Sequence, residues 1–106
     1  MKVVTSAATV AGDFADRDAA WLKFLELANG IRGLTVLSSQ RFDFPGGGLS
    51  GTIIIAESHM AIHTWPELGR AWVELSSCGT VESVRTWEAR VAAAWPPVAG
   101  WDRIKH

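Results

Sequence analysis

The apolar run TIIIA at residues 52–56 constrains the fold of this chain more than any other feature of its sequence. A continuous run of this kind, rich in β-branched side chains, is typical of a buried strand. It follows PGGGLSG at 45–51, which is expected to be a loop because this composition does not hold regular structure. HMAIHT then continues extended until the proline of Trp65-Pro66 ends it. The centre of the chain is therefore predicted to be strand.

Segments with helical spacing are predicted on either side of this region. The first runs from Asp13 to Asn29 and stops at Gly30, and the second follows Gly79 with Thr80 as its cap. Their apolar stripes are Phe14, Trp21, Leu25 and Ala28, with Leu22 beside them, and then Val84, Trp87, Val91 and Trp95. Further strands are predicted at 2–10, 34–42 and 71–77, and the tail AGWDRIKH stays open between a short strand and a frayed end.

This order of elements, β-α-β-β-β-α, predicts one domain over residues 1–106, of the α/β (α+β) class. We expect a two-layer sandwich in which an antiparallel sheet carries both helices on one face. The other face is partly apolar and is expected to need a partner. Two copies packed through these faces would form a homodimer with four layers, αββα.

Composition limits the classes of partner. A content of 48% hydrophobic and 20% charged residues indicates a packed core, and a net charge of -1 offers no basic patch for nucleic acid. The single cysteine excludes an intrachain disulfide and a four-cysteine zinc site, and it suits a reducing compartment. No apolar run reaches the roughly 18 residues that span a bilayer, and the start does not resemble a signal peptide. A cytoplasmic protein without nucleic-acid or membrane partners is expected.

Residues whose side chains can take part in catalysis or metal binding are concentrated in 57–67, which reads ESHMAIHTWPE. His59 and His63 are four apart, a spacing that suits a metal on a helix, but the flanking sequence is strand-like and we predict no metal site. A serine hydrolase is disfavoured because the chain has no G-x-S-x-G motif. Taken singly, each of these residues is most simply a surface, capping or buried group.

Taken together, residues 57–67 resemble the processing-site motif of the bacterial and archaeal S-adenosylmethionine decarboxylases. Phe44 and the loop Gly48-Leu49-Ser50-Gly51 precede the motif, and Cys78-Gly79 follow it, where that family has them. The order of elements also fits from near residue 2 to about residue 95. The resemblance implies a two-layer α/β sandwich that dimerises through its sheets.

The resemblance further implies that the chain cleaves itself between Glu57 and Ser58, leaving a β chain, 1–57, and an α chain, 58–106. Ser58 attacks the carbonyl of Glu57, β-elimination follows, and hydrolysis of the dehydroalanine leaves a pyruvoyl group. Decarboxylation of an α-amino acid leaves electrons on carbon, so it needs an electron sink. A covalent pyruvoyl ketone supplies one through a Schiff base with the substrate.

The same resemblance assigns roles to the other residues. His63 is the base for the elimination, Ser50 assists processing, and Cys78 is the acid that protonates the substrate carbon. Phe44 is expected to stack on adenine and Glu67 to accept hydrogen bonds from ribose hydroxyls. His59 is left open between a structural and a pocket-lining role.

Some positions depart from the family pattern and leave the substrate open. The first strand lacks the usual acidic residue within 4–7, Phe42 stands where histidine is common, and Glu74 and Ser76 replace an aspartate and an aromatic residue. The leading hypothesis is decarboxylation of S-adenosylmethionine for spermidine, a polyamine. The alternatives are an arginine or ornithine decarboxylase with the same pyruvoyl chemistry, and a binding or regulatory relative that never processes.

Overall fold

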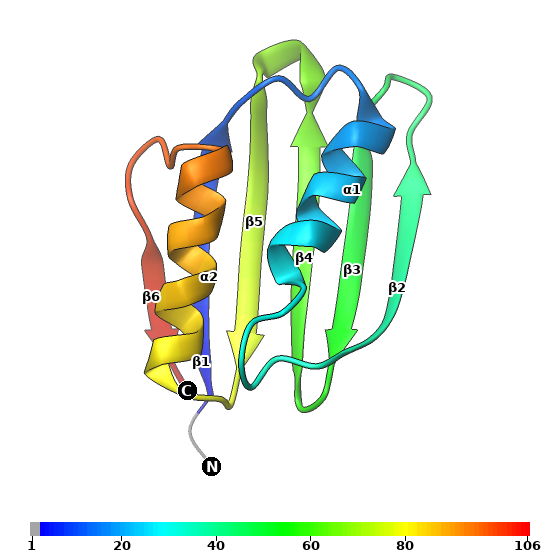
Figure 1. The fold of residues 1–106 in the computed structure, drawn as a ribbon. Helices are drawn as coiled ribbons and strands as arrows, with labels where there is room; N and C mark the ends of the chain where they lie inside the picture. The colour runs from blue at the N-terminus through cyan, green and yellow to red at the C-terminus, as the bar shows by residue number, and fades with distance from the viewer. Residues whose placement is uncertain (1–2) are drawn as a thin grey trace.

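Six strands form an antiparallel sheet, and two helices cover one face of it, in the computed structural model, which describes residues 3–106 (Figure 1). The strands are β1 (Val4–Ala11), β2 (Val36–Asp43), β3 (Leu49–Ile55), β4 (Ser58–Trp65), β5 (Arg70–Ser77) and β6 (Asp102–Lys105). The helices are α1 (Arg17–Ala28) and α2 (Val81–Ala94), and the short 3-10 turn η1 (Pro66–Leu68) joins β4 to β5. The order across the sheet is β2-β3-β4-β5-β1-β6. The predicted two-layer fold is confirmed.

The centre of the sheet is a hairpin, whereas the sequence had suggested one extended segment through residues 52–65. β3 ends at Ile55 and β4 begins at Ser58, and these two residues are partners in register. The chain reverses at Ala56-Glu57, where Glu57 has a φ of 62°. Tight reversals often need such a positive φ, which glycine, asparagine or aspartate usually supplies. Neither Ala56 nor Glu57 signals a turn, so this hairpin was missed.

Two more boundaries differ from the prediction. The loop expected over 45–51 ends at Gly48, because β3 already begins at Leu49. Leu49 and Gly51 lie at every second position before Ile53, so all three belong to the buried face of this strand. The tail that was left open forms β6, which pairs with β1.

Helix α1 begins at Arg17, later than the predicted start at Asp13. Asp16 is the cap that sets this boundary, because its side chain accepts a hydrogen bond from the backbone N–H of Ala19 at 3.0 Å. Phe14 therefore precedes the helix, and its ring lies 5.1 Å from that of Trp95.

The predicted apolar side chains pack into the core, although Phe14 does so from outside α1 and Leu22 does not. Leu22 is 64% exposed, so it is not buried with the stripe of α1, and Phe24 is fully buried instead. In α2 the predicted stripe is buried throughout, and Thr80 caps the helix by accepting from the Ser83 N–H at 3.1 Å. Both helices thus bury aromatic side chains against the inward residues of the sheet.

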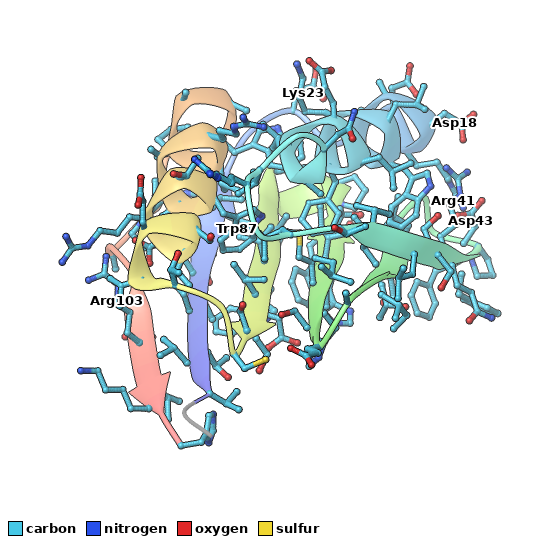
Figure 2. All side chains as sticks on the ribbon, turned by 60° about the horizontal axis from the view of Figure 1, so that its bottom comes forward. Asp18, Lys23, Arg41, Asp43, Trp87 and Arg103 are labelled. Atoms are coloured by element: carbon cyan, nitrogen blue, oxygen red, sulfur yellow. The ribbon has the colours of Figure 1, made fainter. Side chains whose placement is uncertain are left out.

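Each edge strand is fastened to the helix layer by an arginine (Figure 2). On β2, Arg41 pairs with Asp18 of α1 and with Asp43 of its own strand. On β6, Arg103 donates to both carboxylate oxygens of Glu88, a buried residue of α2. Figure 2 shows the two arginines at opposite edges of the sheet.

The second face of the sheet has no helix over it in Figure 1. Several large apolar side chains on this open face are exposed, among them Phe42, Ile54 and Trp65. The open face is the surface through which a second copy was expected to pack. Within the described residues, neither helix combines the length and the apolar character needed to cross a membrane.

Candidate active site

The Glu57-Ser58 peptide lies in the β3–β4 turn, beside the end of β5. Cys78, the first residue after β5, donates from its thiol to the backbone carbonyl oxygen of Glu57 at 3.1 Å. The same thiol lies 3.7 Å from a carboxylate oxygen of the Glu57 side chain. Antiparallel pairing of β4 and β5 sets Ser58 opposite Ser77, which brings Cys78 to the turn. The three residues predicted for the cleavage site and the acid are therefore together.

Ser77 belongs to this group and was not predicted. Its hydroxyl is buried and accepts a hydrogen bond from the Ser58 hydroxyl at 3.0 Å and another from the Gly79 N–H at 2.9 Å. This contact orients the Ser58 hydroxyl and leaves its oxygen lone pairs free. The only available signal in the sequence was the position of Ser77 directly before Cys78, and serine is too common for that to stand out.

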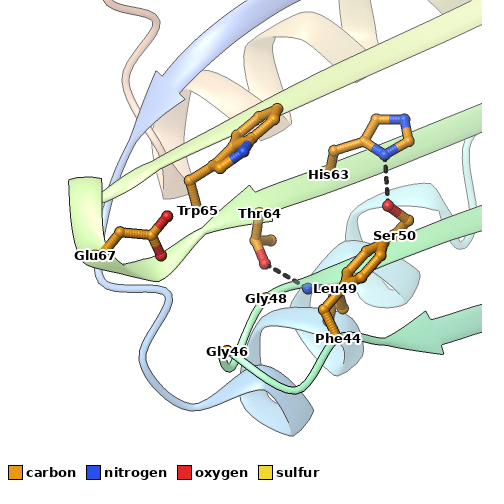
Figure 3. Close-up of a pocket in the computed structure, with 9 residues that line it drawn as sticks. All are labelled: Phe44, Gly46, Gly48, Leu49, Ser50, His63, Thr64, Trp65 and Glu67. Carbon is orange, nitrogen blue, oxygen red and sulfur yellow. Dashed lines mark hydrogen bonds between the residues drawn. The ribbon is translucent and has the colours of Figure 1, made fainter.

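The other predicted residues meet at the opposite end of β4 (Figure 3). Phe44, Ser50, His63 and Glu67 line one cavity of about 310 Å³. The cavity lies where the β2–β3 loop faces the β4–η1 junction. All four residues in this group were assigned from the family resemblance, and the fold gathers them in one place. Thr64 and Trp65 also line the cavity, although neither was predicted.

Hydrogen bonds hold this cavity in shape. Ser50 and His63 are partners across β3 and β4, and Ser50 Oγ lies 2.7 Å from His63 Nδ1 (Figure 3). The buried Thr64 hydroxyl accepts from the backbone N–H of Leu49 at 3.0 Å. A Cβ at Gly48 would lie 2.7 Å from the Thr64 carbonyl oxygen, so glycine permits this close approach of the loop. The imidazole is thereby oriented and still reachable from the cavity.

The two groups of residues are far apart within one chain. Ser58 and His63 lie five residues apart on β4, which corresponds to about 16 Å of extended strand. Their side chains also project to opposite faces, because odd and even positions of a strand alternate. One chain therefore presents the Ser58 hydroxyl, the Glu57 carbonyl and the Cys78 thiol at one end of the sheet. It presents the His63 imidazole, beside a cavity with an aromatic ring and a carboxylate, at the other end.

The remaining candidates add little chemistry. His59 is exposed, and it lies about 13 Å along the strand from His63, so the two rings share no metal in one chain. Over residues 3–106 no group of three or more histidine, cysteine, aspartate or glutamate side chains is placed to hold a metal ion. A second cavity, of about 590 Å³, lies between the α1–β2 connection and the start of α2, and no residue to which the sequence analysis gave a chemical role lines it.

Comparison with known proteins found relatives that share one family name. The family model described as S-adenosylmethionine decarboxylase matches residues 3–95. The S-adenosylmethionine decarboxylase proenzyme of Pseudomonas paraeruginosa is 40% identical over 73 residues, covering 65% of this chain and 46% of the relative. That of Thermococcus gammatolerans is 47% identical over 57 residues, covering 54% of this chain and 39% of the relative. The chain thus spans less than half the length of these curated relatives.

The fold has a close counterpart among solved structures. The crystal structure of adenosylmethionine decarboxylase from Aquifex aeolicus superposes with a TM-score of 0.78 at 28% identity. The match covers 98% of this chain and 88% of that one. Together with the family model over residues 3–95, this match places the chain in the S-adenosylmethionine decarboxylase family.

Proposed function

We propose that this chain is the proenzyme of a self-processing decarboxylase that acts on S-adenosylmethionine. The observation that carries the proposal is the contact of the Cys78 thiol with the carbonyl oxygen of Glu57, directly before Ser58. A donor on that oxygen polarises the carbonyl carbon that the Ser58 hydroxyl must attack. Glu57 also holds a left-handed backbone, which costs a non-glycine residue on the order of 1 kcal/mol and favours a reaction that breaks this peptide bond.

Cleavage needs no other reactant than water. The Ser58 hydroxyl adds to the Glu57 carbonyl, and the C–N bond breaks to leave an ester and a free amine. Loss of the Ser58 Cα proton then expels the Glu57 carboxylate by β-elimination. The dehydroalanine that remains tautomerises and is hydrolysed to a pyruvoyl group and ammonia. Ser77 orients the Ser58 hydroxyl for the first step by accepting its hydrogen bond, and the proton of that hydroxyl passes to the amine that is released.

The elimination also needs a base, and the separation of His63 from Ser58 supports a second copy as its source. A two-fold axis that runs across the strands, between two open faces, exchanges the two ends of the sheet. The cavity of one copy then lies toward the Glu57-Ser58 turn of the other. In the proposed homodimer, His63 and Ser50 of each copy serve the cleavage site of its partner. Each complete site requires both chains.

The residues around Ser58 fit a covalent pyruvoyl group. The group needs no binding pocket of its own, since it forms from Ser58 in place, and Cys78 next to it offers a proton donor. When present, the ketone supplies the sink for the electrons that decarboxylation leaves on carbon. Cys78 would then return a proton to that carbon, which is the role expected of it from the sequence.

The cavity favours a substrate that carries adenosine. Phe44 offers an exposed ring face, and Glu67 offers a carboxylate that can accept from two adjacent hydroxyls. The product of this reaction would supply the aminopropyl group of spermidine. The alternative substrate is a basic amino acid, arginine or ornithine, and one observation favours it. Glu74 lies half-buried in the middle of the open face, where its negative charge suits a cationic side chain. A non-processing relative is the third candidate.

Intact mass and carbon dioxide release test the proposal. The purified protein should convert at neutral pH into two pieces that correspond to 1–57 and 58–106, and Ser58→Ala should stay in one piece. The processed protein should release labelled carbon dioxide from carboxyl-labelled S-adenosylmethionine. A homogeneous uncleaved mass after long incubation would overturn self-processing. Cleavage followed by release from arginine or ornithine alone would establish the rival substrate instead.

A further inference from the structure

Phe42 and Phe44 form an aromatic pair at the end of β2, beside the cavity that contains His63. Their ring centroids are 5.0 Å apart and the ring planes are inclined by 64°, an edge-to-face arrangement. The two residues meet because side chains two apart in a strand project to the same face. Phe44 lines the cavity and Phe42 does not. The cavity wall therefore has a second aromatic residue behind it.

The backbone at Phe44 is fixed, but its side chain is free on most sides. Its N–H donates to the Gly48 carbonyl at 2.9 Å, and its own carbonyl accepts from the Gly47 N–H at 3.1 Å. These two bonds hold the Cα in place, yet the side chain is 46% exposed. When a ligand immobilises an exposed side chain, the lost rotamer freedom costs entropy and lowers the affinity. Contact with the ring of Phe42 is the restraint that the structure provides.

Phe42 is itself placed by the sheet. It is the register partner of Ser50, the residue bonded to His63, so only strand β3 separates it from His63. It is 62% exposed and lies on the open face of the sheet. Edge-to-face packing leaves Phe44 with at least one free ring face. A flat aromatic ligand can stack on that face, whereas an aliphatic amino acid gains little from it.

We propose that Phe42 is a positioning residue for specificity, which holds Phe44 in the orientation that stacks on a purine. The inference rests on the proposed function, because it assumes that the cavity takes the adenosine part of a substrate. Phe42 acts through Phe44 and touches no reacting atom. Its removal should therefore weaken ligand binding and raise KM, while kcat of the bound substrate stays the same.

Calorimetric titration of the Ser58→Ala protein tests this, since that protein cannot cleave or turn over its ligand. The probes are adenosine, S-adenosylmethionine and arginine. In this background Phe44→Ala should weaken adenosine binding more than tenfold, and Phe42→Ala should weaken it about 3- to 10-fold, the range of one aromatic pair. Phe42→Tyr keeps the ring and should bind as the parent does, whereas Phe42→Leu should resemble Phe42→Ala.

Every outcome bears on one of the two proposals. Parent-like adenosine binding by Phe42→Ala or Phe42→Leu overturns the role of Phe42, and so does an equal loss of arginine binding. A shift of Phe42→Ala to a smaller species in size-exclusion chromatography also overturns it, because Phe42 would then be a contact between copies. A parent protein that binds neither adenosine nor S-adenosylmethionine contradicts the proposed substrate, whether or not it binds arginine. The same variants are also made without the Ser58→Ala change, so that they can process. If Phe42→Ala then lowers kcat without raising KM, the positioning role is refuted.

Discussion

The Cys78 thiol donates a hydrogen bond to the backbone carbonyl oxygen of Glu57 across the end of the sheet, with 3.1 Å between the two atoms. The sequence had assigned Cys78 to the turnover of substrate, as the acid that protonates carbon. Its position in the uncleaved chain adds a contact with the carbonyl that Ser58 would attack in the proposed cleavage. One side chain is therefore placed to act in both stages, and the two stages can be separated by experiment.

Cys78→Ala should slow self-cleavage by about tenfold, because a neutral hydrogen bond to the developing oxyanion is lost. Cys78→Ser keeps a donor at this position and should cleave closer to the native rate. The measurement is the uncleaved fraction against time by intact mass. After cleavage, Cys78→Ala should lose most decarboxylation, since a general acid contributes about 10²–10⁴-fold. Full turnover by the cleaved Cys78→Ala protein would remove Cys78 from the second stage.

Mixing two inactive variants should restore cleavage if His63 acts on the partner chain. Ser58→Ala lacks the nucleophile, and His63→Ala should be slowed by about 10²–10⁴-fold for want of the base. In a mixed dimer the first chain supplies His63 and the second supplies Ser58, so one complete site forms. Mass spectrometry should then find cleavage of the His63→Ala chain alone.

The control for this mixing experiment is the double variant that carries both changes on one chain. Mixed with Ser58→Ala, it offers no chain with a nucleophile, so no cleavage is expected. If His63→Ala is never rescued although mixed dimers are demonstrated, the base acts within its own chain or is a different residue.

Glu67→Gln separates the two candidate substrates. For S-adenosylmethionine, the amide keeps part of the acceptor capacity toward ribose, and the loss should be about 1–3 kcal/mol in transition-state binding. For arginine or ornithine, the change removes the counter-charge of an ion pair, and the loss should be about 3–5 kcal/mol. The check is kcat/KM for all three substrates with processed enzymes. An unaffected kcat/KM for the preferred substrate would exclude Glu67 from its binding.

The Glu88–Arg103 pair should make stability depend on pH in the acid range. Burial alone would raise the pKa of Glu88, but hydrogen bonds from Arg103 and Ser6 outweigh burial and hold this pKa below its usual value. A depressed folded-state pKa adds stability above the unfolded value of about 4.3, and that stability is lost as pH falls through the folded-state pKa. Glu88→Gln should therefore lower the free energy of unfolding by about 1–3 kcal/mol near neutral pH.

Urea unfolding of both proteins over this pH range measures the effect, and the gap between them should close below about pH 4. Glu26→Gln is the matched control, because Glu26 is an exposed helical glutamate whose ion pair with Lys23 should contribute little. A gap that stays constant with pH would mean that Glu88 stabilises the fold by packing and not by its charge.

Gly51→Ala should destabilise the fold through Trp21. A Cβ at Gly51 would lie 2.3 Å from Cζ3 of the Trp21 ring, which is too close for any real contact. Overpacking of this kind costs about 1–3 kcal/mol, to be measured by urea unfolding in the Ser58→Ala background. The same change should cost less free energy of unfolding when it is made in the Trp21→Leu protein, where the smaller side chain leaves room for the added Cβ. Equal losses in both backgrounds would show that the ring is not the obstacle.

The sequence predicted the layers of the fold better than its turns. Helical spacing and strand alternation depend on burial, and the stripe of α2 and the alternation of Ala71, Val73 and Leu75 follow that pattern closely. The β3–β4 turn was missed because its positive φ falls on Glu57, a residue type without turn preference. Leu49 was placed in a loop because the three glycines before it dominate the local composition. Leu22 was misplaced because it lies next to a real stripe.

The site was predicted as a set of residues but not as an arrangement. The motif contains Ser58 and His63 five residues apart in one segment. A strand separates residues by about 3.3 Å for each position, so a short motif along β4 reaches from one end of the sheet to the other. Ser77 and Trp65 were missed because their roles come from neighbours on other strands, which no single segment of sequence reveals.

The order β2-β3-β4-β5-β1-β6 determines what a cut at Glu57 leaves behind. The first piece would keep β1, β2 and β3, and the second would keep β4, β5 and β6, so β1 would remain clamped between two strands of the other piece. Three of the five junctions between neighbouring strands would join the separate pieces. The nicked protein would thus stay assembled, yet its unfolding would release two free molecules from each copy. Its melting temperature should rise with protein concentration even where the uncut monomer would show no such dependence.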